Sequence, residues 1–203
     1  IQMTTLHRPS EEQQACLASL LHDHKNVCVT AEAGAGKTTV FLHAAIQWLA
    51  RYPGHKCLLV CYNRLLCEQT QIRVAALNLK SQVDVMTLHG LVGDMAGTNN
   101  VRDDYRLIQT IKKFSSDRQQ LLNFAYYSLV LVDEVQDMDI NMIHVLNFVF
   151  SLYAPSNRPR IMLVGDDRQE IYKFRTSKVC NVIDHINVQN QEAEDAEENR
   201  CQV

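Results

Sequence analysis

The sequence predicts an α/β fold in which helices cover both faces of a mostly parallel sheet. Two observations predict it: short apolar runs rich in β-branched residues recur along the 203-residue chain, and helical patterns separate them. Strands that are apolar throughout are typical of parallel sheets buried on both faces. The five runs are residues 27–29, 58–61, 83–86, 129–132 and 161–164. We therefore expect a sheet of five or more strands with right-handed crossovers.

Three segments between these runs have helical patterns. In residues 40–49, apolar pairs recur at the helical period, and Pro53-Gly54 is a helix-ending signal. Residues 63–79 are expected to form a second helix. Residues 141–153 are apolar on most sides, so we expect a buried helix between the last two strands. Residues 93–104, rich in Gly, Asn and Asp, are expected to form an irregular loop.

Composition excludes some classes of protein. No apolar run approaches the roughly 20 residues of a membrane-spanning helix, and the start of the chain lacks the pattern of a targeting signal. The seven cysteines form no C-x-x-C pair, and several lie in apolar runs, where free thiols behave as small hydrophobes. We expect an intracellular protein without a membrane partner, with nuclear and cytoplasmic locations both open.

The acidic residues are concentrated near the end of the sequence. Residues 190–203 hold five of the 23 Asp and Glu but one of the 20 Lys and Arg, which leaves 18 acidic and 19 basic residues in the rest. The net charge of -3 therefore neither supports nor excludes a nucleic-acid partner. We expect residues 1–190 to form one domain and residues 191–203 an acidic, disordered tail or linker.

The strongest local motif is residues 31–38, Ala-Glu-Ala-Gly-Ala-Gly-Lys-Thr, which follow an apolar strand and open an amphipathic helix. Small residues there let backbone N–H groups turn toward phosphates, and the helix N-terminus adds positive potential. Lys37 would reach the β- and γ-phosphates, and the Thr38 hydroxyl would coordinate Mg²⁺. Ala31 departs from the usual first glycine. A turn of small residues is the structural alternative, but it gives no reason for the Lys-Thr pair. The predicted nucleotide-binding residues here are Ala33, Gly34, Ala35, Gly36, Lys37, Thr38 and Thr39.

Two carboxylates follow the strand at residues 129–132, at the end where open α/β sheets bind ligands. Asp133 is expected to hold Mg²⁺, and Glu134 to orient or deprotonate the attacking water. The alternative is that such carboxylates cap the next helix. For Asp139 we favour that capping role, and Asp137 has no assigned role.

A second motif begins on the next apolar run. Residues 133–137, Asp-Glu-Val-Gln-Asp, and residues 165–175, Gly-Asp-Asp-Arg-Gln-Glu-Ile-Tyr-Lys-Phe-Arg, together closely resemble the UvrD/Rep/PcrA branch of superfamily 1 helicases. From about residue 9 to residue 175, the chain looks like their first RecA-like motor lobe. The resemblance implies a RecA-like P-loop NTPase fold, ATP and Mg²⁺ as cofactors, a γ-phosphate sensor at Gln169, and a phosphate or carboxylate partner for Arg175.

The resemblance also implies contacts outside these motifs. Ser10 to Gln13 resemble a segment whose glutamine recognises adenine, although Ser10-x-x-Gln13 is also a capping box. The residues expected to contact single-stranded DNA are Tyr62, Asn63, His89, Tyr172 and Phe174. Aromatic rings stack on bases for roughly 1–3 kcal/mol each. The alternative is that the three aromatic residues and His89 have ordinary structural roles.

By this resemblance the chain is the ATP-binding N-terminal lobe of an ATP-dependent DNA helicase or translocase that moves 3′ to 5′ on single strands, with RNA still open. A second RecA-like lobe of the same parent would supply catalytic arginines, so we expect residues 1–203 alone to bind ATP weakly and hydrolyse it poorly. About 40 residues separate His89 from Asp133, too few for the accessory subdomain of the bacterial relatives. The alternative function is a regulatory nucleotide-binding or protein-interaction module without motor activity.

Overall fold

A computed structural model of the chain describes residues 6–22, 26–30, 36–116, 126–153 and 155–166. Its centre is a five-stranded sheet in which all paired strands are parallel, in the order β1-β5-β4-β2-β3. The strands are β1 (Val27–Thr30), β2 (Cys57–Cys61), β3 (Val83–Thr87), β4 (Leu129–Val132) and β5 (Arg160–Gly165). All five expected strands are thus confirmed, and each lies within two residues of its expected bounds.

The strand order brings distant segments together at one edge of the sheet. The carboxyl ends of β1, β5 and β4 lie side by side, and those of β2 and β3 continue the same edge. The predicted phosphate loop follows β1, and the two carboxylates follow β4. All strands run in the same direction, so the segments that follow them share this edge, which is where open α/β sheets bind ligands.

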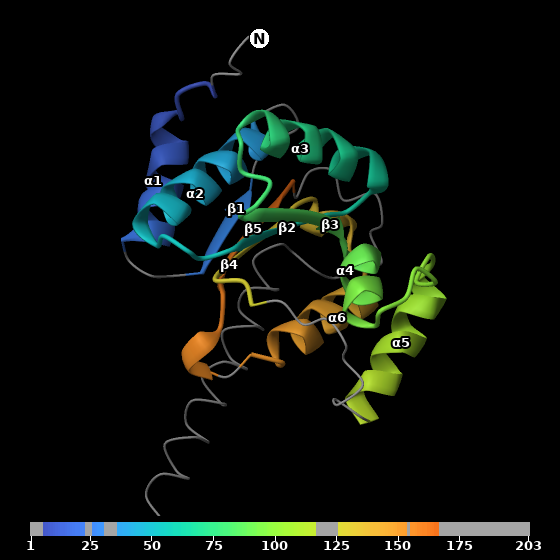
Figure 1. The fold of residues 1–203 in the computed structure, drawn as a ribbon. Coiled ribbons are helices and arrows are strands. Elements are labelled where there is room, and N and C mark those ends of the chain that lie inside the picture. The colour runs from blue at the N-terminus through green and yellow to red at the C-terminus, as the bar shows by residue number, and fades with distance from the viewer. Residues whose placement is uncertain (1–5, 23–25, 31–35, 117–125, 154, 167–203) are drawn as a thin grey trace, which may run out of the picture.

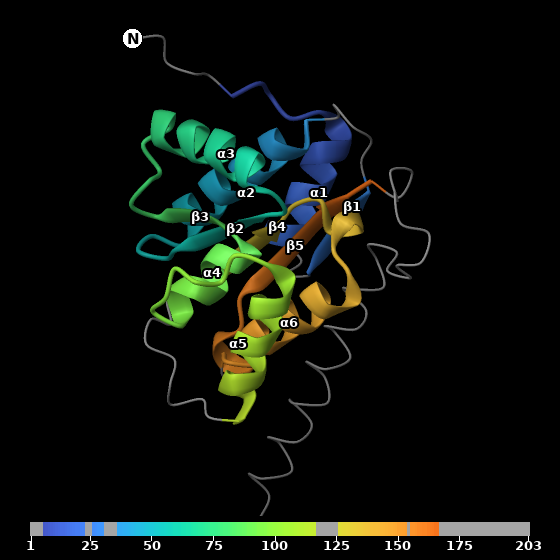
Figure 2. The ribbon, with the colours of Figure 1, turned by 90° about the vertical axis from the view of Figure 1, so that its right-hand side faces the viewer.

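Three helices cover one face of the sheet (Figures 1 and 2). They are α1 (Glu11–Leu21), α2 (Lys37–Arg51) and α3 (Arg64–Ala76). Helix α1 begins with the expected capping box between Ser10 and Gln13. Asn63 is the N-cap of α3, and its side-chain oxygen accepts a hydrogen bond from the Leu66 N–H at 2.8 Å. Helix α2 ends two residues before Pro53, as the sequence predicted.

On the opposite face of the sheet lie α4 (Leu88–Met95) and α6 (Ile140–Phe150), and α5 (Asp104–Ser116) packs on the outside of these two helices (Figures 1 and 2). The Thr87 hydroxyl caps α4, and the Asp139 carboxylate caps α6 by accepting from the Met142 N–H at 2.9 Å. The capping role favoured for Asp139 is therefore confirmed.

Alternate strand residues divide the core into two clusters. Leu129 and Leu131 of β4 pack under α1–α3, whereas Val130 and Val132 pack over α4–α6. All four side chains are at most 2% exposed, and burying each contributes about 1.5–3 kcal/mol. Both faces are covered, which explains why the strands are apolar without alternation.

The loop expected at residues 93–104 is only partly present. Residues 93–95 form the end of α4, and Asp104 opens α5, so the irregular segment is shorter. A Cβ on Gly93 would lie 2.8 Å from the Thr98 carbonyl oxygen, so this glycine permits a close packing contact and does not mark a loop. Helix α5 was not predicted, although Leu107, Ile111 and Phe114 give it a buried face.

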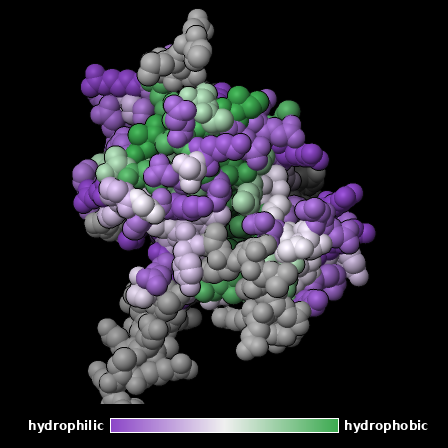
Figure 3. Space-filling model, in the orientation of Figure 1, coloured by the Kyte–Doolittle hydropathy of each residue, from purple (hydrophilic) through white to green (hydrophobic). Residues whose placement is uncertain are grey.

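The visible surface is largely hydrophilic, with hydrophobic residues showing between the polar ones where α1–α3 lie (Figure 3). None of the helices within the described residues is long and apolar enough to cross a membrane. The acidic segment at residues 191–203 lies outside the described residues.

Candidate functional site

The site begins where β1 leads into α2. Gly36 has a φ of 80° and serves as the N-cap of α2, a left-handed conformation that glycine adopts without the steric cost of a Cβ. The helix opens directly on Lys37, Thr38 and Thr39. Gly36 has no side chain with which to cap this N-terminus, so the backbone N–H groups that open the helix and the positive end of the helix dipole favour an anion there.

Lys37 and Glu134 form an ion pair across the edge of the sheet. The Lys37 Nζ donates to the Glu134 Oε2 at 2.8 Å, with the two side chains 9% and 22% exposed. The two residues are 97 positions apart in the chain. The pairing of β1 with β5 and of β5 with β4 brings their segments together. The phosphate-loop lysine and the expected catalytic glutamate therefore share one site.

Glu134 has an unusual backbone conformation. Its φ of 50° lies in the left-handed region, which costs a residue with a Cβ about 1–2 kcal/mol. The next three residues form a short 3-10 helix, η2 (Val135–Asp137). Strained conformations of this kind are common at functional sites. Here the left-handed conformation turns the chain after β4, and the Glu134 side chain contacts Lys37.

Asp133 is a buried carboxylate, only 3% exposed. Its Oδ1 accepts a hydrogen bond from the Glu134 N–H at 2.9 Å. Burial is the main cause that raises the pKa of Asp133 to about 6, and the Glu134 charge raises it further, while the Glu134 N–H and Lys37 lower it. A cation beside Asp133 would favour its ionised form, so the carboxylate fits the expected metal ligand.

Gln136 belongs to the site, although no role was predicted for it. Its side chain is 4% exposed. The Nε2 donates to the Glu134 Oε2 at 2.5 Å, and the Oε1 accepts from the Asp166 N–H at 3.0 Å. Gln136 thus ties Glu134, the expected catalytic residue, to the end of β5, where the second motif begins. The available signal in the sequence was the position of this amide side chain, two residues after Glu134 and inside the motif of residues 133–137.

Gln13 lies beside the phosphate loop. Its Oε1 accepts from the Ser10 N–H at 3.0 Å in the capping box. A Cβ on Gly36 would lie 3.3 Å from the Gln13 Nε2. The amide therefore caps its own helix with one atom and faces the start of α2 with the other, which is compatible with both roles that the sequence left open.

A groove lies farther along the same edge, beyond β2 and β3. Its volume is about 860 Å³, and both Tyr62 and His89 line it. Tyr62 is half-buried and also packs against the core cluster between the sheet and α4–α6. His89 Nε2 lies 3.1 Å from the Asp104 Oδ1. Two residues with expected contacts to single-stranded DNA thus share one surface.

The groove has a mixed charge. Arg64 and Arg102 line it together with Glu68, which pairs with Arg64 at 3.1 Å. The pair is exposed, so it contributes little to stability and can rearrange. Asn63 uses its side-chain oxygen to cap α3, so any contact it makes with nucleic acid would involve its amide group or its backbone.

Seven predicted site residues lie outside the described residues. These are Ala33, Gly34, Ala35, Gln169, Tyr172, Phe174 and Arg175. Within the described residues, no group of three or more His, Cys, Asp and Glu side chains is arranged to hold a metal ion. A magnesium ion held mainly by nucleotide phosphates, with one or two side chains, does not need such a group.

Comparison with known protein sequences gives a family and a relative. The AAA domain family matches residues 13–175. The RecBCD enzyme subunit RecB of Buchnera aphidicola subsp. Schizaphis graminum is 30% identical over 77 residues, which is 38% of this chain and 6% of RecB. The chain thus spans a small part of that relative.

Two solved helicase structures are similar to this chain. The Pif1 helicase from Candida albicans has a TM-score of 0.49 and 21% identity, over 78% of this chain and 32% of Pif1. The UvsW helicase from Bacteriophage T4 has a TM-score of 0.52 and 13% identity, over 88% of this chain and 57% of UvsW. The likeness to UvsW is one of fold, and with the observed sheet it confirms the expected RecA-like architecture. None of these findings singles out the UvrD/Rep/PcrA branch.

Proposed function

Because the chain belongs to the AAA domain family, we propose that it is the ATP-binding N-terminal motor lobe of an ATP-dependent helicase or translocase of the superfamily 1 type, and that it acts on single-stranded DNA. The observation that carries the proposal is the Lys37–Glu134 ion pair at the carboxyl edge of the sheet, 2.8 Å long. It joins the phosphate-binding and water-activating residues in one site.

The ion pair suggests how nucleotide binding prepares the site for hydrolysis. Lys37 is held by Glu134, and a bound γ-phosphate would compete for the same ammonium group. Glu134 would then be free to accept a proton from water while Gln136 keeps its carboxylate in place. Because Gln136 also binds the Asp166 N–H, movement after β5 would reach Glu134 directly. Gln169 and Arg175, three and nine residues farther along, are the proposed sensor and phosphate partner.

Magnesium is the cation that we propose for this site. Bound between nucleotide phosphates and protein, it would neutralise charge on the transferring phosphoryl group. Thr38 and Asp133 are the residues that would hold it. Asp133 supports this choice because its buried charge is poorly compensated by the surrounding side chains, as its raised pKa indicates.

The groove beyond β2 and β3 is the proposed contact for single-stranded DNA. Tyr62 offers a half-buried ring on which a base can stack, and Arg64, Arg102 and His89 offer polar and charged groups for the backbone. Such contacts do not distinguish sequences, so we expect no sequence preference. Asn63, Tyr172 and Phe174 are proposed as further contacts, and movement is proposed to run 3′ to 5′.

The strand order offers a path by which a change at the proposed nucleotide site can reach the proposed DNA groove. Nucleotide contacts follow β1, β5 and β4, and the groove residues follow β2 and β3, with β4 paired directly to β2. Asp133 illustrates this proximity, because its N–H donates to the Val60 carbonyl oxygen of β2 at 3.0 Å. A shift at β4 therefore reaches β2 through the backbone.

Two binding measurements on the 203-residue chain test the proposal. Fluorescent ATP with Mg²⁺ should bind the unaltered chain and lose at least tenfold in affinity in Lys37→Ala. A labelled oligothymidylate strand should bind about tenfold more weakly to Tyr62→Ala, since a stacking ring contributes roughly 1–3 kcal/mol, whereas Tyr62→Phe keeps the ring and should bind like the unaltered chain. Equal ATP affinity in Lys37→Ala, or equal DNA affinity in Tyr62→Ala, would contradict it.

A further inference from the structure

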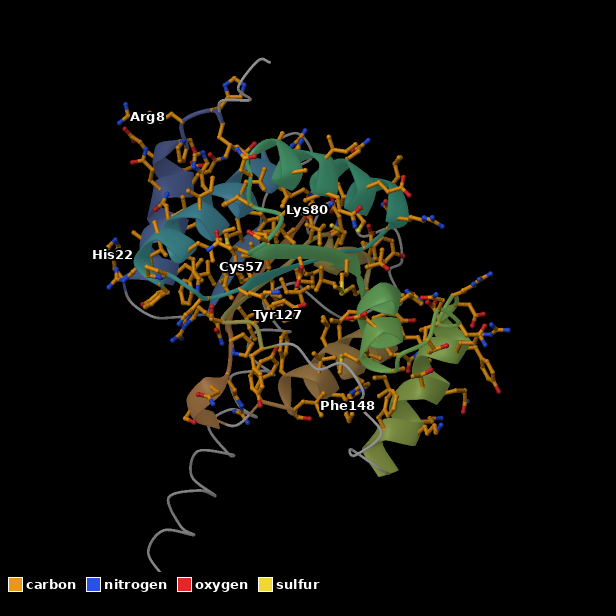
Figure 4. All side chains as sticks on the ribbon, viewed as in Figure 1. Arg8, His22, Cys57, Lys80, Tyr127 and Phe148 are labelled. Carbon is orange, nitrogen blue, oxygen red and sulfur yellow. The ribbon has the colours of Figure 1, made fainter. Side chains whose placement is uncertain are left out.

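A second pocket lies at the opposite, amino-terminal edge of the sheet. It has a volume of about 610 Å³ and is bordered by the end of α2 and by the residues that precede or open β2, β4 and β5. Lys37 and the carboxylates Asp133 and Glu134 are at the other ends of the same elements. Tyr127, labelled in Figure 4, lines this pocket just before β4. The pocket is therefore separate from both halves of the site described above.

Three cations line this amino-edge pocket, namely Lys56, Arg158 and Arg160, and none of the described residues that line it is acidic. The backbone fixes two of them. The Ser128 N–H donates to the Lys56 carbonyl at 2.9 Å, and the Arg160 N–H donates to the Ser128 carbonyl at 2.9 Å. Lys56 and Arg160 therefore flank Ser128 on successive strands, with backbones roughly 10 Å apart at about 4.8 Å per strand.

One hydrogen-bond donor of the Arg160 side chain lacks a partner among the described residues. Its Nε is buried and makes no hydrogen bond to any residue that the structure describes. Burial lowers the pKa of the guanidinium, while nearby Tyr52 raises it. A half-buried guanidinium with no carboxylate among the described residues of the pocket lining favours an anion, because charge-assisted hydrogen bonds are the strongest that such a group makes.

Aromatic rings form the rest of the wall. Trp48 and Tyr52 have centroids 4.6 Å apart, and Tyr52 stacks on His55 at 5.5 Å with 21° between the planes. The Trp48 Nε1 donates to the Ser128 Oγ at 2.9 Å, which fixes the indole. Tyr126 is 66% exposed at the rim. Exposed and half-buried rings beside cations are the combination that proteins use for bases and phosphates of nucleotides.

We propose that the amino-edge pocket binds a nucleoside phosphate, with the base against the rings of Tyr52, His55 and Tyr126 and the phosphate between Lys56 and Arg160. The ligand is either a free nucleotide or one unit of a nucleic-acid strand. An acidic peptide would use the cations but would place no planar group against the rings.

Trp48 provides the measurement, because it is the chain's only tryptophan and it lines the pocket. The Lys37→Ala variant, treated with EDTA, serves as background so that the phosphate loop does not contribute. Trp48 emission is followed while thymidine monophosphate, an oligothymidylate strand of about 8 nucleotides, inorganic phosphate or a polyglutamate peptide is added. Saturable change with thymidine monophosphate indicates a free nucleotide as ligand, and change with the strand alone indicates a nucleic acid. Either result supports the proposal.

Three further variants locate the binding. Lys56→Ala combined with Arg160→Gln removes both phosphate partners and should weaken binding at least tenfold. Tyr126→Ala removes an exposed ring and should weaken it severalfold without affecting folding. Lys112→Ala removes an exposed cation from α5 and should change nothing. Thermal unfolding of each variant establishes that it is folded.

Four results would overturn the proposal: no saturable binding of either nucleotide probe, unchanged affinity in both the double variant and Tyr126→Ala, phosphate binding as tightly as thymidine monophosphate, or tighter binding of polyglutamate than of both nucleotide probes. The Lys37→Ala background removes the phosphate loop, and the pocket variants leave the groove at Tyr62 and His89 intact, so a loss of binding in these variants is distinct from a failure of the motor function proposed above.

Discussion

Replacing Asp133 with asparagine should stabilise the chain while it removes the proposed metal ligand. Asp133 is 3% exposed, and its pKa rises from 3.8 to about 6, chiefly because of burial. Above pH 6 the folded chain therefore carries a buried charge that the unfolded chain exposes to water. Asparagine has nearly the same shape, and its side-chain oxygen can still accept from the Glu134 N–H.

The rise in pKa sets the size of the effect. At about 1.4 kcal/mol per pH unit, the change from 3.8 to about 6 destabilises the unaltered chain by about 3 kcal/mol at pH 7.5. The direction follows from proton binding. Between pH 4 and 6 the folded state binds more protons than the unfolded state. The stability that protonated Asp133 contributes is therefore fully present below pH 3.8 and is lost as the pH rises through 6. At pH 4.5 the difference is only about 1 kcal/mol.

Urea denaturation of both chains at pH 7.5 and pH 4.5 tests this reasoning. Asp133→Asn should be more stable by about 1–3 kcal/mol at pH 7.5, and the advantage should shrink at pH 4.5. Mg²⁺ with ATP should stabilise the unaltered chain more than the variant, because binding to the folded state raises stability. A variant that is less stable at pH 7.5, or an advantage that is independent of pH, would refute the assignment of Asp133 as an uncompensated buried carboxylate.

Three further predictions concern the fold. Gly93→Ala should destabilise the chain by about 1–3 kcal/mol in urea denaturation, because its Cβ would meet the Thr98 carbonyl oxygen at 2.8 Å; unchanged stability would mean that this contact is not held. Burial raises the pKa of both Cys57 and Cys61 to about 12, so iodoacetamide at pH 8 should leave both unlabelled in the folded chain by mass spectrometry, and labelling before unfolding would contradict their burial. Ser10→Ala should cost about 1 kcal/mol in thermal unfolding through loss of the α1 cap, and a shift as small as that of an exposed α5 substitution would argue against the capping box.

The strands could be predicted from sequence because burial on both faces requires apolar residues at consecutive positions. The runs that became β2, β4 and β5 are apolar at nearly every position, as strands buried on both faces of a parallel sheet are. Several helix starts were also readable. Ser10 and Asp139 are N-cap residues followed at the right spacing by the N–H groups that they accept from.

Other features depend on contacts between distant residues. The Lys37–Glu134 pair could be expected as two members of one site, but not as a direct contact. The bridge from Gln136 to the Asp166 N–H arises only because β4 and β5 are neighbours. Gly93 was read as part of a loop because glycine signals irregular backbone and close packing equally well, and only the position of Thr98 separates the two.

The amino-edge pocket had no signal in the sequence. Lys56, Ser128 and Arg160 each precede or open a different strand, and a lateral row of backbone hydrogen bonds brings them together. Single cations and tyrosines at strand starts are common on protein surfaces. Their shared position, and the lack of acidic side chains among the described residues of the pocket lining, become visible only once the strand order is known.

The proposed motor function is tested most directly by the ATPase activity of the full-length parent protein, measured with and without single-stranded DNA. We expect DNA to stimulate hydrolysis in the unaltered protein, and both Lys37→Ala and Glu134→Gln to abolish the stimulated rate, because one removes the phosphate partner and the other the base that activates water. Hydrolysis that ignores single-stranded DNA, or that persists in Glu134→Gln, would contradict the motor function and favour a regulatory nucleotide-binding module.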